Sequence, residues 1–457
     1  MRHRKRDLTA PVKSNLTLRF TDDRLTSFAG LELFRQFLHG IQFSKRLRYH
    51  LRKCDPSGDF SSVGMVRLLV AMFLVGASRL GHVAYLSGDP LVHRFCGLKL
   101  LPGERTLSRW LSRCSASVRS ALHALNTDVL SGTLDRLNLR RLTVDVDGTV
   151  LSTGLHVQRA FRGYNPHRRK VPSYYPITAF LAQTAQFLRV QNRSGNVHDG
   201  KASLPFLRDL FRQLHHMAPK ALLEIRLDGA FFRKEIVAFL EPRAEYAIRV
   251  PFYTWLDLQG LVQERKRWKH IRSDLHAFQA TVFIPTWNRS VRVAIYRKRV
   301  FHKTRKNFQL DLFDPSNGTW EYSAIATNKK LGLKALWSFL AGRGAHEKAI
   351  GELKSGYAFD TIPTQNHAGN SAWQILSTLA YNLVAGFQIQ TGAPMRTKTR
   401  KRTSLFVLKS IFTLRYEVLS RAGILQRPHG QPTLTLSENL PARRTFETLN
   451  AKLAQAA

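Results

Sequence analysis

The chain has 457 residues, and its 71 Lys and Arg stand against 31 Asp and Glu, which gives a formal net charge of +40. Hydrophobic residues make up 44% of the sequence, enough for a large buried core, and this excludes an intrinsically disordered chain. So large a positive surplus requires a polyanionic partner. Nucleic acid fits better than a ribosomal partner or an acidic membrane surface, because phosphates exchange condensed counterions for Lys and Arg.

The cysteines and the apolar segments indicate the cellular compartment in which the protein works. Cys54, Cys96 and Cys114 are odd in number and form no CxxC pair, so neither a disulfide framework nor a zinc site is indicated. The basic start at residues 1–6 is not followed by the apolar run of a signal peptide. The stretch 63–77 contains Arg67 and is too short to span a bilayer. We therefore expect a cytoplasmic, nucleoid-associated protein with no membrane partner.

Residues 1–138 predict a helical N-terminal DNA-binding region. Apolar residues recur at helical spacing over 31–38 and again over 66–75. At 102–111 the sequence predicts a short basic helix with Thr106 as its N-cap. That helix is either the DNA-reading element of a helix-turn-helix or an ordinary surface helix, and the sequence leaves both open.

Residues 139–250 predict the first part of an α/β core. Over 141–147 apolar residues alternate with Thr143, Asp145 and Asp147, the period-two pattern of a strand. Strands are expected again within 177–190 and over 222–227, the latter ending at Asp228. Helices are expected at 204–214 and 237–240. This order predicts helices packed on a sheet.

The second half of the chain predicts three further parts. Residues 251–321 form a β-rich, basic insertion with several tryptophans. Residues 322–390 continue the core, with a strand at 322–327, one long helix from 331 to about 355 and another at 372–388. Residues 391–457 are a basic linker, 396–402, followed by a helical C-terminal region.

Four acids and two cations stand out from this pattern. Asp145 and Asp147 share one face of their strand, and Asp228 ends another. Arg343, Glu347 and Lys354 lie within about 40° of one another around their helix, on one stripe. Each acid could instead end a strand or cap a helix, and Arg343 with Glu347 could be an ordinary surface pair. In-line attack at a phosphodiester, however, calls for two divalent cations held by hard carboxylate oxygens and for cationic side chains on the phosphate.

The sequence resembles a known family at several ordered motifs. The run Arg343-Gly-Ala-His-Glu347, with Lys354 six residues after the glutamate, resembles the Tyr-x2-Arg-x3-Glu-x6-Lys signature of DDE transposases of the IS-four superfamily of bacterial insertion sequences. Five further runs resemble its IS-thirteen-eighty branch: Thr143 to Thr149, Gly163 to Pro166, Arg226 to Phe231, Gly351 to Lys354 and Leu379 to Leu383. The similarity covers roughly residues 140–390.

The resemblance implies a ribonuclease-H-like catalytic core interrupted by the β-rich insertion. It implies catalytic, metal-binding acids at Asp147, Asp228 and Glu347, with Asp145 as the rival first acid. It also implies two Mg²⁺ ions, for which Mn²⁺ can substitute. The residues implied in binding DNA phosphates are Arg343, Lys354 and Lys348, and those implied in stacking on a base are Trp287 and Trp320.

The function implied is strand cleavage at transposon ends and strand transfer into target DNA. The partners are double-stranded DNA, as terminal inverted repeats and target, and a second copy of the chain in a synaptic complex. One departure matters: the signature Tyr falls at Leu340, which cannot hydrogen-bond a phosphate. The alternatives are therefore a catalytically inactive DNA-binding protein derived from a transposase and a nuclease without strand transfer.

Overall fold

The computed structural model describes residues 15–21, 24–56, 58–163, 165, 168, 170–301, 319–396 and 404–456. The basic start at 1–6, Tyr164 and Pro166 of one family-like motif, and most of the basic linker (397–402) lie outside these residues.

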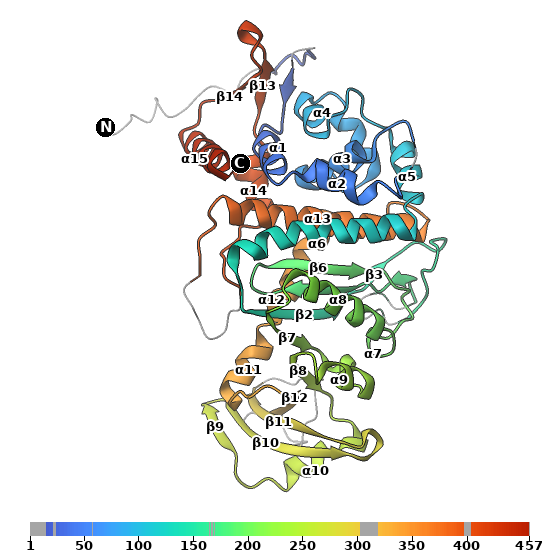
Figure 1. Ribbon diagram of the computed structural model, residues 1–457, viewed down its shortest axis with the longest axis vertical. Helices are drawn as coiled ribbons and strands as arrows, with labels where there is room; N and C mark the ends of the chain where they lie inside the picture. The colour runs from blue at the N-terminus through green and yellow to red at the C-terminus, as the bar shows by residue number, and fades with distance from the viewer. Residues whose placement is uncertain are drawn as a thin grey trace, which may run out of the picture.

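A nine-stranded mixed sheet forms the centre of the molecule, in the order β6-β5-β2-β7-β8-β12-β11-β10-β9 (Figure 1). Strands β2, β7 and β8 are parallel to one another, and the remaining neighbours are antiparallel. The strand bounds are β2 Arg141–Gly148, β5 Ile177–Leu181, β6 Gln186–Gln191, β7 Leu222–Leu227, β8 Glu245–Val250, β9 Lys269–Arg272, β10 Leu275–Ile284, β11 Arg289–Val300 and β12 Thr319–Thr327.

The described residues of the segment 251–321, which the sequence predicted to be β-rich, contain β9, β10, β11 and the start of β12, and these strands extend the core sheet. β12 joins it to the core, because β12 pairs with β8 on one side and with β11 on the other. Two short elements, η4 Thr254–Leu256 and α10 Leu258–Gln263, precede its strands.

Two long helices separate the sheet from a helical layer. α6 Ala116–Leu137 and α13 His367–Gln390 run side by side above the sheet in Figure 1. Every residue of α13 from Gly369 to Gln388 is buried, because the helix packs on β6 below and on the N-terminal helices above. The helix is therefore buried all around, as expected for a helix enclosed by protein, and it includes buried polar residues such as Asn370, Gln374 and Asn382. Three helices pack elsewhere on the core: α7 Asp199–Ala202, α8 Leu204–Met217 and α9 Lys234–Leu240.

The N-terminal region is helical, as predicted, but one predicted cap is wrong. Its helices are α1 Leu31–Gly40, α2 Phe43–Leu51, α3 Ser62–Val75, α4 Pro90–Cys96 and α5 Glu104–Ser112, with the 3-10 segment η2 Leu80–Leu86. The N-cap of α5 is Gly103, and Thr106 lies inside the helix. A threonine cap at 106 would start the helix at Leu107, whereas α5 starts three residues earlier, at Glu104, with Leu107, Trp110 and Leu111 as its buried residues.

The C-terminal region is not purely helical. β13 Gly423–Gln426 pairs with β14 Thr433–Leu436 and with β1 Leu25–Thr26 from the opposite end of the chain. These strands are two to four residues long, too short to show an alternating pattern in the sequence. The helices here are α14 Ile411–Leu414, continued by a π-helical turn at Arg415–Leu419, and α15 Leu440–Ala456.

The single long helix predicted at 331–355 is wrong: two helices, α11 Leu333–Ala341 and α12 Gly344–Tyr357, occupy this stretch. The carbonyl of Phe339 accepts from Nη1 of Arg226 at 2.9 Å and from the N–H of Gly342 at 3.2 Å, while the N–H of Arg343 donates to the carbonyl of Leu340. A Cβ at Gly342 would lie 2.2 Å from the same Nη1, so only glycine fits there. The break makes Arg343 the N-cap of α12.

Two smaller predictions concern membranes and thiols. Among the described helices, none is by itself long and apolar enough to cross a membrane. Within the described residues, only α3 and η2 taken together have the length and apolar composition of a membrane span, and the two are bent by 85° relative to each other. All three cysteines are free thiols; Cys96 and Cys114 are buried, and burial raises the pKa of each to about 12.

We predict that Arg415 fastens the C-terminal region to the rest of the molecule. Its guanidinium donates to the carbonyls of Leu74 (2.8 Å) and Phe73 (2.6 Å) at the end of α3, and to Gly356 of α12 (2.5 Å). Hydrogen bonds to a charged donor contribute about 1.5–3 kcal/mol each, with incomplete additivity. Arg415→Met should therefore lower the free energy of unfolding in urea by about 3 kcal/mol, whereas the exposed Arg444→Met should leave it unchanged within about 0.5 kcal/mol.

Candidate active site

The predicted acids Asp147 and Asp228 come from neighbouring parallel strands. Asp147 lies near the carboxyl end of β2, and Asp228 directly follows β7, which pairs with β2 in parallel. The carboxyl ends of parallel strands meet at one edge of a sheet, where ligands of open α/β sheets bind. The Oδ1 of Asp228 accepts from the backbone N–H of Ala230 at 2.9 Å, which caps a short 3-10 turn and fixes the side chain.

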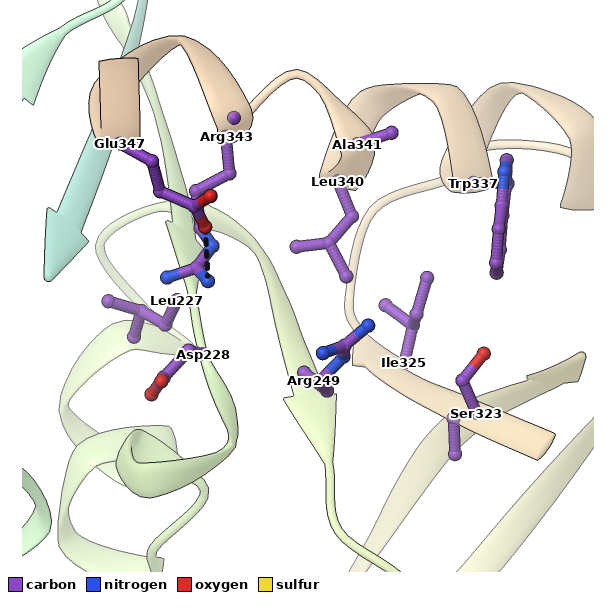
Figure 2. Close-up of a pocket in the computed structure, with 12 residues that line it drawn as sticks. Leu227, Asp228, Arg249, Ser323, Ile325, Trp337, Leu340, Ala341, Arg343 and Glu347 are labelled. Carbon is purple, nitrogen blue, oxygen red and sulfur yellow. Dashed lines mark hydrogen bonds and ion pairs between the residues drawn. The ribbon is translucent and has the colours of Figure 1, made fainter. Parts of the chain in front are cut away.

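One guanidinium joins the third acid to this edge. Arg343 donates from Nη1 to Oδ2 of Asp147 at 3.1 Å and from Nη2 to Oε1 of Glu347 at 3.2 Å. Arg343, Glu347 and Asp228 line the same cleft of about 260 Å³. Figure 2 shows the carboxylate of Glu347 directed at the Arg343 guanidinium, with Asp228 rising from the strand end on the opposite side of the cleft. Arg343 and Glu347 are thus neighbours one turn apart at the start of α12, and the contact with Asp147 joins this turn to the end of β2.

The acids perturb one another. Burial raises the pKa of Asp147 to about 7; Arg343 opposes the rise, and the nearby carboxylates of Asp228, Asp199 and Glu347 reinforce it. Burial likewise raises the pKa of Asp228, against the lowering effect of Arg343. Carboxylates that resist ionisation because of burial and mutual repulsion mark a place where additional positive charge would be stabilising.

Asp145, the rival first acid, has a different environment. Its carboxylate accepts from Nε and Nη2 of Arg226 at 2.5 and 2.7 Å, and both side chains are fully buried. Since Arg226 also holds Phe339 at the end of α11, the pair ties together β2, β7 and that helix. Neither Asp145 nor Asp147 is among the residues that line the cleft, but Asp147 contacts Arg343, which does line it.

The other predicted site residues are only partly brought together. Lys354 donates from Nζ to the carbonyl of Val150, just beyond β2, at 3.0 Å. Lys348 is exposed and lines a separate pocket beside Phe180 and Tyr381. The sequence analysis expected Lys348 to contact DNA phosphates beside the acids. Because Lys348 directly follows Glu347, it is rotated from Glu347 by about 100° around α12 and so faces a different pocket.

Neither predicted stacking tryptophan lines the acid cleft. Trp287 packs on Phe232 at a ring-centroid distance of 4.9 Å, and Trp320 packs on His276 at 5.2 Å. The aromatic residue that does line the cleft is Trp337 of α11. Base stacking by Trp287 and Trp320 stays a prediction about their half-buried surfaces.

The sequence analysis missed two other residues near the acids. Arg249, near the end of the third parallel strand β8, lines the cleft; its position at a strand end was a usable signal. Asp199 is buried, is paired with Arg193, and accepts from the Tyr175 hydroxyl at 2.8 Å. A Cβ on Gly148 would lie 2.7 Å from Asp199 Oδ2, so Asp199 lies against the residue that follows Asp147.

The donor chemistry at this site suits a hard divalent cation. Carboxylate oxygens are the ligands that Mg²⁺ prefers, and a single cationic group of the chain already contacts two of the three acids. Within the part of the chain that the structure describes, no three His, Cys, Asp or Glu side chains stand in a metal-coordinating group. The residues that could hold a metal are Asp147, Asp228 and Glu347.

Comparison with known proteins gives the family. A family model described as "Transposase DDE domain group 1" matches residues 9–457, so the chain belongs to this family of transposases. A search of curated proteins found no match. Among solved structures, the chain is similar to a piggyBac transposase in a synaptic complex with hairpin DNA, with 9% identity, coverage of 93% of this chain and 85% of that one, and a TM-score of 0.43.

We predict that Asp145 is required for stability. Arg226 stays protonated at any pH that a folded protein tolerates, so Asp145→Asn would leave a buried guanidinium without its counter-charge. Removing one partner of a buried pair costs about 3–5 kcal/mol, and this loss should appear in urea unfolding. The exposed Asp135→Asn is the control and should change the free energy of unfolding by less than about 0.5 kcal/mol. A stable Asp145→Asn protein would contradict the structural role.

We also predict that Asp147 makes the metal-free protein less stable as pH rises. The pKa of Asp147 in the folded protein is about 7, above its ordinary value, so between about pH 4 and pH 7 the folded state binds more protons than the unfolded state and stability falls. In EDTA, Asp147→Asn should match the wild type near pH 4 and exceed it by on the order of 2–3 kcal/mol at pH 8. Thermal unfolding across this range measures the difference; a constant difference would show that the carboxyl is not perturbed.

Proposed function

We propose that the protein is a DDE transposase that cleaves DNA strands at transposon ends and transfers them into target DNA, in a metal-dependent reaction. One observation carries the proposal: acids from β2, β7 and α12 gather around Arg343. They do so in a chain whose formal net charge is +40. Membership of the transposase family supports the same reaction class.

We propose further that the core is ribonuclease-H-like, with residues 251–321 as its insertion, and that the chain is of the IS-thirteen-eighty type within the IS-four superfamily. The support for the core is its topology: the meander β2-β5-β6 is followed by β7 and β8, which join parallel to β2 on its other side. The support for the branch is the set of sequence motifs around Asp147, Asp228 and Glu347.

The site residues divide into two roles in this proposal. Asp147, Asp228 and Glu347 would hold two Mg²⁺ ions, for which Mn²⁺ can substitute. When bound, such ions stabilise the negative charge that builds on the phosphorus during in-line displacement. Arg343 and Lys354 bind the oxygens of the DNA phosphate, and the planar guanidinium of Arg343 suits bidentate contacts. Arg343 must then exchange at least one of its two carboxylate contacts for a phosphate oxygen.

The partners proposed are terminal inverted repeats and target DNA. A homodimer would hold two ends in a synaptic complex, in the cytoplasm and on the nucleoid. The helical N-terminal region, including the basic α5, is proposed to contact the ends. The support is the charge of the chain and the exposure of Arg105 and Arg109 on α5, whose apolar side is buried.

A second candidate function is a DNA-binding protein that has lost catalysis. The observation in its favour is Leu340, which stands where the family signature has Tyr and which lines the acid cleft beside Arg343. An aliphatic side chain at this point offers a phosphate no hydrogen bond. This candidate predicts tight DNA binding and no cleavage at any metal concentration.

The decisive experiment is cleavage of a duplex that carries the terminal sequences flanking the coding region. With Mg²⁺, the wild type should release free 3′-hydroxyl ends and form joined products. Asp228→Asn and Glu347→Gln should each lower the rate by roughly 100-fold or more, since even residues that support a metal ligand cost 10–100-fold. The readout is separation of labelled strands on a denaturing gel.

Glu264→Gln, an exposed acid outside the cleft, is the matched control and should cleave at the wild-type rate. Full activity in both site variants would show that the acids are wrongly assigned. Cleavage without joined products would instead indicate a nuclease, and binding without cleavage the inactive DNA-binding protein.

A further inference from the structure

A second cationic pocket lies in the helical N-terminal region, apart from the acid cleft. It has a volume of about 420 Å³ and is bounded by α1, α2 and α3. Four cationic side chains line it, and no Asp or Glu is among its lining residues; the cations are Arg35, Lys45, Arg48 and Arg67. In Figure 1 these three helices lie on the far side of α6 and α13 from the sheet.

Arg67 is the residue that makes this pocket unusual. It is the only charged residue of α3, whose other positions are largely apolar and buried. The one hydrogen bond found for its side chain runs from Nη1 to Ser44 Oγ at 3.3 Å, and its Nε is buried without a partner. Burial lowers the pKa of Arg67; Cys96 opposes this shift, and the neighbouring charges of Arg35 and Arg48 add smaller decreases.

No carboxylate nearby accounts for this charge. Among the described residues, Arg67, Lys45 and Arg48 have no ion-pair partner. Glu32 pairs with Arg35 at 2.7 Å and with Arg94 at 2.9 Å, and it does not line the pocket. Arg67 is half-buried and its enclosed Nε has no partner; partial burial of a cation without a counter-charge is costly, so the pocket is electrostatically incomplete.

The N-terminal end of α2 adds to the positive potential of the pocket. α2 begins at the pocket wall, its N-cap Gln42 makes no side-chain capping bond, and its first turn contains no acid. The N-terminal end of a nine-residue helix carries a partial positive charge and uncapped N–H groups, which favour an anion. Solvation explains the exposed Lys45 and Arg48 equally well, but it does not explain the buried Nε of Arg67.

We propose that this pocket binds a phosphoryl group, supplied by the backbone of duplex DNA. The naming of DNA rests on the proposed function; the phosphoryl chemistry rests on the pocket alone. The guanidiniums of Arg67 and Arg48 offer planar donors, Lys45 brings a point charge at the rim, and Arg35 contributes positive charge although two of its nitrogens donate to Glu32. The pocket would hold DNA at a site remote from the scissile bond and so would fix the register of the protein on the duplex.

The first test uses inorganic phosphate against chloride at equal ionic strength, with EDTA present. Phosphate at ten times its Kd should raise the Tm of the wild type by on the order of 2 °C. Lys45→Gln/Arg48→Gln removes the two exposed cations and should abolish the rise. Arg52→Gln/Lys53→Gln removes two exposed cations near the end of the same helix, outside the pocket, and should keep it. The rim pair carries the test because Arg67 packs over Phe95 within the core.

The second test measures duplex affinity by fluorescence anisotropy as salt is varied, again in EDTA so that cleavage plays no part. Loss of one phosphate contact lowers the slope of log affinity against log salt by about 1. Lys45→Gln/Arg48→Gln should show this fall, and Arg52→Gln/Lys53→Gln should not.

A Tm rise with no change in slope would support the phosphoryl site and assign it to a small phosphate rather than to DNA. A fall in slope confined to the rim variant supports the DNA backbone. Equal Tm rises in all three proteins, together with equal slopes in the two double variants, would overturn the site. Because neither measurement requires strand cleavage, failure of the proposed transposase reaction would leave both results interpretable.

Discussion

The buried ion pair between Arg226 and Asp145 is the interaction on which the arrangement of the acid cleft depends. It joins β7 to β2 below the cleft, and the remaining Nη1 of Arg226 binds the last turn of α11 through Phe339. This contact, with the glycine at 342, interrupts the helix and starts a new one at Arg343. Asp145 therefore acts on the site indirectly, by holding Arg226 in place. Asp147, two residues further along the same strand, contacts Arg343 directly.

The cleft is a small region of negative charge in a strongly cationic molecule. Asp147 and Asp228 are half-buried, and Glu347 is exposed. Burial raises the pKa of Asp147 and of Asp228, nearby carboxylates reinforce both rises, and Arg343 is the only cation that pairs with two of the three acids among the described residues. The N-terminal pocket is the complementary case, because there the cations lack a carboxylate. Both sites are electrostatically unbalanced in the isolated chain, and a duplex with divalent cations has the charges that would balance both.

Periodicity predicted most of the core strands and helices, because each buries one face or both and so repeats its apolar residues. Periodicity did not predict features that depend on contacts between residues distant in the sequence. The break between α11 and α12 comes from a contact of Arg226, which is 113 residues away from Phe339 in the sequence. The strands β13 and β14 are four residues each and are stabilised by pairing with β1 near the other end of the chain.

The sequence by itself determined the charge, the α/β character and the candidate acids, because these follow from residue types and their local spacing. Only the tertiary structure decided which acids share an environment. Asp145 and Asp147 occupy the same face of one strand and are equivalent by pattern, yet one is enclosed with Arg226 and the other meets Arg343. The same holds for Lys348 and the tryptophans, whose surroundings are set by residues distant in the chain. Local spacing fixes direction along one element, whereas burial and ion pairing depend on the elements that pack against it.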